Sequence, residues 1–180
     1  MNRKSKALDL TYMALGAVLI AVCSWISIPA SVPFTLQTFA VFLVLGLLGG
    51  KRGTVSILVY LLLGAIGIPV FSGFTGGFSR LIGMTGGYLI SYIFIGLIYW
   101  GAGKLFGTKL PVRIISMLVG NLVCYAFGTA WFMVVYAGQT GPIGLGTALG
   151  MCVIPFILPD LLKIALAIFL AGRLRKPLHL

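Results

Sequence analysis

The sequence predicts an all-α integral membrane protein with six transmembrane helices and with both its N and C termini in the cytoplasm. Its composition makes a bilayer the expected solvent, because 60% of the 180 residues are apolar or aromatic and only 8% are charged. Six stretches approach the roughly 20 apolar residues that a helix needs to cross a membrane. The cationic residues gather in alternate connections between those stretches. We therefore expect residues 1–180 to form one multi-pass transmembrane domain in the plasma membrane.

The first three apolar stretches differ in character. The first follows a basic segment and carries Trp25 near its outer end, where aromatic residues commonly mark the membrane interface. The second is the shortest, and Gln37 near its start predicts a helix that is tilted, broken or partly exposed to a polar cavity. The third starts after Lys51 and Arg52 and ends in a glycine-rich loop. The predicted ranges are residues 7–28, 32–49 and 53–71.

The last three stretches are bounded in the same way. The fourth ends near Trp100, an expected anchor at the inner interface. The fifth is apolar except for Asn121, which we expect to join helices by hydrogen bonding. The sixth contains Pro155 and Pro159, which predict a kinked or delayed helix start. The predicted ranges are residues 86–103, 112–137 and 151–172.

The positions of the cations predict the orientation. Lys and Arg are enriched in the cytoplasmic connections of membrane proteins, and placing the N terminus inside puts most of the thirteen cations there. Arg80 is then the cation of the external loops, and Lys163 lies within the last span. The cytoplasmic set is Arg3, Lys4, Lys6, Lys51, Arg52, Lys104, Lys109, Arg113, Arg173, Arg175 and Lys176.

The connection at residues 67–85 combines many glycines with phenylalanines. One interpretation is a connector that dips into the membrane interface. The other is a lid over an outward-facing pocket, because glycines supply hinge freedom and phenylalanines supply apolar cover. The sequence leaves both open.

Enzymatic chemistry is not expected. The chain has two acidic residues, Asp9 and Asp160, and no glutamate, so it lacks the paired carboxylates of acid–base catalysis. His179 is the one histidine, and the three cysteines, Cys23, Cys124 and Cys152, have no metal-ligand spacing. We expect no metal and no resident cofactor. The positions of the cations make membrane lipid, not nucleic acid, the expected surroundings.

Asp160 and Lys163 are the strongest candidates for a binding site. They lie in an otherwise apolar span, where a charge costs about 2.5 to 3.5 kcal/mol and commonly marks function. Three residues apart on a helix, they share one face. A ligand site is the favoured interpretation, and an ion pair that only fastens the last helix is the alternative. Polar residues predicted at the same depth, Thr35, Gln37 and Tyr88, complete a candidate pocket.

Small residues form a stripe on the first predicted helix. Ala14, Ala17 and Ala21 recur at intervals of three and four residues, which lets another helix approach closely. That helix can belong to the same bundle or to a partner protein.

Four segments taken together resemble the BioY family, the biotin-specific substrate-capture (S) components of energy-coupling factor (ECF) transporters. These are SVPFTLQTFAVFL at residues 31–43, YLLLGAIGIPVFSG at 60–73, GMTGGYL at 83–89 and PDLLK at 159–163. Met84 and Arg80 depart from the family's usual pattern. The resemblance covers nearly the whole chain.

The resemblance implies an S-component fold and high-affinity capture of biotin at the outer membrane face. It also implies a transmembrane coupling protein and two ATPase subunits as partners, with Ala14, Ala17 and Ala21 as the surface that meets the coupling protein. The sequence has no G-x-x-x-x-G-K-[ST] phosphate loop, which agrees with a motor on other chains.

Biotin suits the candidate residues chemically. Asp160 can accept hydrogen bonds from the ureido N–H groups, and Lys163 can pair with the carboxylate or donate to the ureido oxygen. Aromatic side chains are expected to cover its apolar middle, namely Phe34, Phe71, Phe74, Tyr88 and Trp131. The alternatives are an S component for another vitamin, because one fold can bind unrelated ligands, and a membrane scaffold without a ligand.

Overall fold

The structure is a computed structural model, which describes residues 3–28 and 32–178, with the side chains of residues 3–5 and 176–178 left aside. Long helices dominate the described chain, which confirms the predicted all-α membrane fold. Five helical segments of this part are long and apolar enough to cross a membrane. His179 lies outside the described residues.

The N-terminal half consists of two long helices joined by a short strand pair. Helix α1 spans Arg3–Trp25 and leads into β1, Ser27–Ile28, which pairs antiparallel with β2, Phe34–Thr35. Helix α2 follows at Gln37–Ala65. The sequence does not predict the strand pair, and the second helix starts at residue 37 rather than at residue 32, because residues 34–35 are extended.

Helix α2 is a hairpin of two arms that meet at Gly49. Gly49 has φ 78° and ψ 173°, a conformation that residues with a Cβ rarely adopt. The side chains of Gln37 and Tyr60 are hydrogen-bonded at 2.7 Å, although a continuous helix would separate those residues by about 35 Å. The chain therefore reverses at Gly49, and the predicted second and third helices correspond to residues 37–48 and 50–65. The sequence predicts a connection at residues 50–52 between these two helices, and in the structure a single residue, Gly49, makes the connection.

The C-terminal half begins with a short helix, α3, at Phe78–Ile82 within the glycine-rich connection. Helices α4 and α5 follow at Gly86–Phe106 and Leu110–Gln139, close to their predicted ranges. The predicted last helix is two helices, α6 at Leu145–Cys152 and α7 at Ile154–Leu178. The break falls at Val153, two residues before Pro155, and α7 continues through Pro159.

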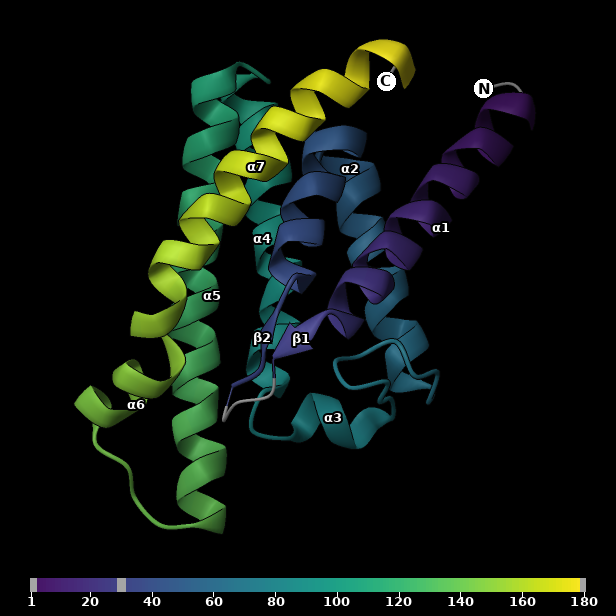
Figure 1. Cartoon of the computed structure of the whole chain (residues 1–180). Coiled ribbons are helices and arrows are strands. Elements are labelled where there is room, and N and C mark those ends of the chain that lie inside the picture. The colour runs from purple at the N-terminus through teal and green to yellow at the C-terminus, as the bar shows by residue number, and fades with distance from the viewer. Residues whose placement is uncertain (1–2, 29–31, 179–180) are drawn as a thin grey trace.

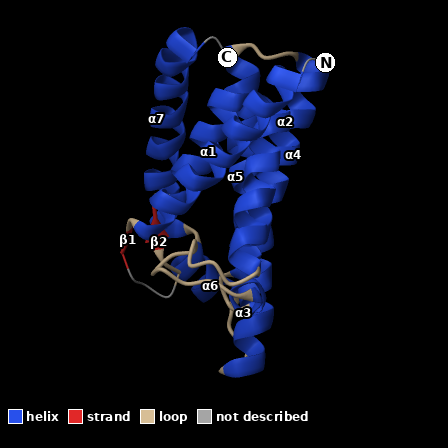
Figure 2. Cartoon of the chain, turned by 90° about the vertical axis from the view of Figure 1, so that its right-hand side faces the viewer, coloured by secondary structure: helices blue, strands red, loops and turns tan. Residues whose placement is uncertain are grey.

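The two arms of α2 lie at the centre of the helix bundle. Helices α1, α4 and α7 all pack against α2, and α5 packs against α4. Figure 1 shows both chain ends at one end of the bundle, with the strand pair, α3 and α6 at the other, and Figure 2 shows the same division from the side. Lys6, Lys51, Lys104, Arg113 and Arg175 of the predicted cytoplasmic set line one cavity at the end that carries the termini.

Candidate functional site

A cavity of about 110 Å³ lies among α2, α4, α5, α7 and the connection between α2 and α4. Its walls are mainly aromatic and hydroxyl-bearing, and it contains charged side chains from α3 and α7. Such a combination of apolar walls and a few placed polar groups is typical of small-molecule sites. The lining includes Thr35, Gln37, Thr38, Phe71, Ser72, Thr75, Arg80, Thr85, Tyr88, Tyr92, Cys124, Tyr125, Cys152, Phe156, Asp160 and Lys163.

Asp160 and Lys163 form a buried ion pair in the wall of this cavity. The Lys163 Nζ lies 2.8 Å from Oδ1 of Asp160, and the exposed fractions of the two side chains are 8% and 4%, respectively. Asp160 is on the first part of α7, and one turn of helix brings the two heads together, as the spacing predicts. Because each charge is desolvated, the pair persists only with further hydrogen bonds.

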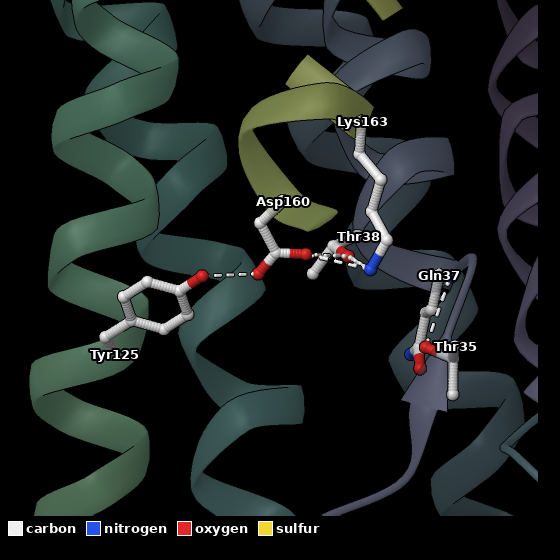
Figure 3. A network of polar contacts seen from close by, with 6 residues as sticks. All are labelled: Thr35, Gln37, Thr38, Tyr125, Asp160 and Lys163. Carbon is white, nitrogen blue, oxygen red and sulfur yellow. Dashed lines mark hydrogen bonds and ion pairs between the residues drawn. The ribbon is translucent and has the colours of Figure 1, made fainter. Parts of the chain in front are cut away.

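Those further hydrogen bonds come from two other helices (Figure 3). The hydroxyl of Thr38 on α2 accepts a hydrogen bond from Lys163 at 3.0 Å and donates one to Asp160 Oδ1 at 3.3 Å. The hydroxyl of Tyr125 on α5 donates to Asp160 Oδ2 at 2.6 Å. Both carboxylate oxygens thus have a protein donor, and α2, α5 and α7 are joined at one point.

Three other predicted residues line the same cavity. Thr35 accepts a hydrogen bond from the backbone N–H of Gln37, which helps to shape the start of α2. The side chain of Gln37 donates to the buried hydroxyl of Tyr60. Tyr88 shares a hydrogen bond of 2.8 Å with Thr129 on α5. Its ring lies where a Cβ on Gly128 would be, so α4 and α5 approach closely because residue 128 is glycine.

The structure separates the three predicted phenylalanines, Phe34, Phe71 and Phe74. Phe34 does not line the cavity. The centroid of its ring lies 4.4 Å from Lys163 Nζ, so the ring makes a cation–π contact with the ammonium, and the ring also stacks with that of Phe156. Phe74 is 65% exposed and stacks on Trp25 with ring centroids 4.9 Å apart. The structure therefore does not bring Phe74 to the cavity. Phe71 of the same connection is buried and does line the cavity.

Tyr125 and Arg80 are the main lining residues that the sequence analysis does not select. A tyrosine in an apolar span has the same pattern as a core residue, so Tyr125 gives no signal on its own. Arg80 is exposed and lies in α3, a helix that the sequence does not predict. Because Arg80 lies in a glycine-rich connection whose path the sequence does not define, the sequence gives no sign that its side chain lines the cavity.

Comparisons with known proteins agree with this geometry. The profile of the BioY family matches residues 1–179. The chain belongs to the BioY family. It is 40% identical over 172 residues to the probable biotin transporter BioY of Pyrococcus horikoshii, covering 94% of this chain and 98% of the relative. It is 39% identical over 159 residues to the biotin transporter BioY of Thermotoga maritima, covering 88% and 90%.

A solved structure extends the comparison to three dimensions. The crystal structure at 2.1 Å of the S-component for biotin from an ECF-type ABC transporter matches with a TM-score of 0.84 and 32% identity. The match covers 98% of this chain and 95% of that chain. The predicted S-component fold is therefore confirmed.

The segments that carry the BioY resemblance meet at the cavity. Residues 32–43, 60–73, 83–89 and 159–163 each contribute at least one lining residue, and Ser31 lies outside the described residues. Segments far apart in the sequence thus share one location in the BioY fold.

The three alanines predicted to meet a coupling protein differ in exposure in the isolated BioY chain. Ala14 is exposed, but Ala17 and Ala21 are only 2% and 6% exposed and belong to the hydrophobic core. The neighbouring Gly16 lies against Ser56 and Val44 of α2. The stripe therefore contributes to close packing between α1 and α2, and the role of Ala14, Ala17 and Ala21 in meeting a coupling protein stays a prediction. A small residue permits close approach whichever helix makes it.

Proposed function

We propose that this chain captures biotin at the outer membrane face and works as the substrate-binding subunit of an ECF transporter. The observation that carries this proposal is the buried Asp160–Lys163 pair in the wall of a small aromatic cavity. The relatives named as biotin transporters and the fold shared with the biotin S-component support the same ligand. A transmembrane coupling protein and two ATPase subunits are the proposed partners.

The cavity offers complementary groups to both ends of biotin. Asp160 is a buried acceptor whose Oδ2 has one protein donor, so we place one N–H of the ureido ring against this carboxylate. Lys163 then lies beside the ureido oxygen. Arg80 is the exposed cation of the lining, so we place the biotin carboxylate toward its guanidinium at the mouth. The aromatic walls cover the sulfur ring and the carbon chain.

Ligand entry requires movement of the cavity wall. A volume of about 110 Å³ is small compared with the roughly 300 to 1,000 Å³ of typical ligand pockets. The connection from residue 66 to residue 77 contributes Phe71, Ser72 and Thr75 to the lining. We propose that this connection moves outward to admit biotin and closes over it, the lid interpretation of the sequence.

The proposed topology has six membrane crossings. We assign one crossing to each arm of α2 and one each to α1, α4, α5 and the α6–α7 segment. The cation-lined end is assigned to the cytoplasm by the positive-inside rule, which places both termini inside and the 110 Å³ cavity toward the outside.

Isothermal titration calorimetry of the purified full-length chain tests the proposal. We expect saturable binding of biotin and none of thiamine or riboflavin at the same concentrations. Binding of another vitamin in place of biotin would keep the S-component role and change the substrate. Biotin methyl ester, which lacks the carboxylate charge, tests the ligand orientation. It should bind the parent chain more weakly than biotin does. The Arg80→Gln variant should bind the ester and biotin with equal affinity.

A further inference from the structure

A second and larger cavity, of about 700 Å³, lies at the end of the bundle that carries both termini. It is enclosed by α1, both sides of the Gly49 break in α2, α4, α5 and the last part of α7. It shares no lining residue with the site proposed for biotin. The biotin proposal therefore leaves it without a role.

The charge of this cavity is strongly one-sided. Its acidic lining residue, Asp9, is already paired with Arg52 at 2.6 Å. The other acidic side chain of the whole sequence, Asp160, is paired with Lys163 in the first cavity. The chain thus has no further side-chain carboxylate to neutralise the remaining cations. The cationic lining residues are Lys6, Lys51, Arg52, Lys104, Arg113 and Arg175.

Two of these cations are held in fixed positions at the Gly49 break. The Nη2 of Arg113 donates to the carbonyl of Gly46 at 3.0 Å, and the Nε of Arg175 donates to the carbonyl of Leu47 at 3.2 Å. These bonds satisfy carbonyls at the end of the first arm of α2. A guanidinium has five N–H donors, so each arginine keeps donors beyond these contacts. Helix capping accounts for the positions of the guanidinium groups of Arg113 and Arg175. It does not explain why lysines line the same cavity.

Part of the remaining wall is apolar. Leu10, Met13, Val55 and Val112 line the cavity together with Trp100, whose ring lies 4.7 Å from the Lys104 Nζ. Leu10 is 65% exposed on the outside of α1. A lining that combines several cations with apolar side chains suits an amphipathic anion better than a free, fully hydrated one.

We propose that this cavity binds the headgroup of an anionic phospholipid, with the phosphate at Arg113 and Arg175 and the start of the acyl chains along the apolar wall. Basic pockets between transmembrane helices on the cytoplasmic side bind such headgroups in other membrane proteins. In the proposed orientation this cavity opens toward the cytoplasmic leaflet, where anionic lipids provide the charge that the chain lacks.

Native mass spectrometry of the purified full-length chain in neutral detergent tests this inference. The chain is titrated with dioleoyl-phosphatidylglycerol, with dioleoyl-phosphatidylcholine, and with inorganic phosphate. We expect the phosphatidylglycerol dissociation constant to be at least about fivefold lower than that of phosphatidylcholine, and inorganic phosphate not to compete. Competition by inorganic phosphate at equal concentration would assign the site to free anions and overturn the lipid proposal.

Matched variants separate this cavity from general surface charge. Arg175→Gln should weaken phosphatidylglycerol binding about fivefold, whereas Arg173→Gln, an exposed position on the same helix outside the cavity, should change it less than about twofold. Lys51 lines the cavity and is exposed, so Lys51→Gln should not disturb folding. It should weaken phosphatidylglycerol binding as Arg175→Gln does. Equal losses in Arg173→Gln and Arg175→Gln would overturn the proposal. Equal binding of both lipids by the parent chain would also overturn it.

Discussion

The hydroxyl of Tyr125 donates a hydrogen bond of 2.6 Å to Oδ2 of Asp160, on the side of the carboxylate opposite Lys163. A tyrosine on α5 thereby fixes the orientation of the main candidate ligand group on α7. Removing a hydrogen bond to a buried charged group costs about 1.5 to 3 kcal/mol.

Tyr125→Phe should therefore lower both the melting temperature and the affinity for biotin, the latter by about tenfold. Tyr88→Phe is the comparison within the same cavity, because the hydroxyl of Tyr88 bonds to a neutral residue, Thr129, instead of a carboxylate. Thermal unfolding and calorimetric titration measure the two effects. Equal losses in both variants would show that Tyr125 has no special role beside Asp160.

The Asp160–Lys163 pair can be tested by a double-mutant comparison. Asp160→Asn and Lys163→Met should each weaken biotin binding at least about tenfold, or ~1.4 kcal/mol, because each removes a charge-assisted contact. The double variant should bind no better than either single variant. An ion pair with only a structural role predicts the opposite: unstable single variants and a double variant that melts and binds like the parent.

Ala17 and Ala14 allow packing to be separated from docking. Ala17→Leu should destabilise the isolated chain by about 1 to 3 kcal/mol, because the larger side chain must fit a filled core. Ala14→Leu, three residues away on the exposed side of α1, should leave the melting temperature unchanged. A parent-like melting temperature for Ala17→Leu would contradict the packing role of this residue.

The proposed orientation can be read by cysteine labelling. Lys109→Cys and Thr140→Cys place reporters at exposed positions beside the two ends of α5. An impermeant maleimide should label Thr140→Cys on intact cells and should label Lys109→Cys only after lysis. The native cysteines are buried, which keeps the background low. Reversed labelling would invert the topology.

The connection between α2 and α4 should become more protected when biotin binds. Ser24 and Trp25 bind the carbonyls of Val70 and Pro69, so one end of the connection is fastened to α1. Hydrogen exchange of residues 71–77 should slow with biotin, because closure removes local opening. Residues 110–117, at the start of α5 and away from the biotin cavity, are the internal control. Unchanged exchange in 71–77 would make this segment a static connector.

The buried charged pair of the site was predictable, whereas the exposed Arg80 was not. Asp160 and Lys163 stand out because a charge inside an apolar span is costly, and the structure places both in one cavity wall. Tyr125 does not stand out, because a tyrosine has the same pattern in a core and in a binding site. The hydrophobic pattern also fixed most helix ranges, since length and apolarity suffice to define them.

Features set by tertiary contacts were not predictable. The alanine stripe has the same spacing whether its neighbour is α2 or a partner, so the burial of Ala17 needed the structure. Phe74 lies in a loop whose path depends on contacts with α1, and stacking on Trp25 carries it away from the cavity. The extended residues 34–35 depend on pairing with residues 27–28, which an apolar run does not reveal.

The charges that line the smaller cavity have an electrical consequence. Asp160, Lys163 and Arg80 sum to one positive charge, and a ligand with a single carboxylate reduces that sum to zero. A membrane voltage of 100 mV acts on one elementary charge with about 2.3 kcal/mol and on a neutral assembly not at all. The lining of the biotin-bound cavity would therefore carry no net charge on which the voltage could act, whereas the lining of the empty cavity would carry one positive charge.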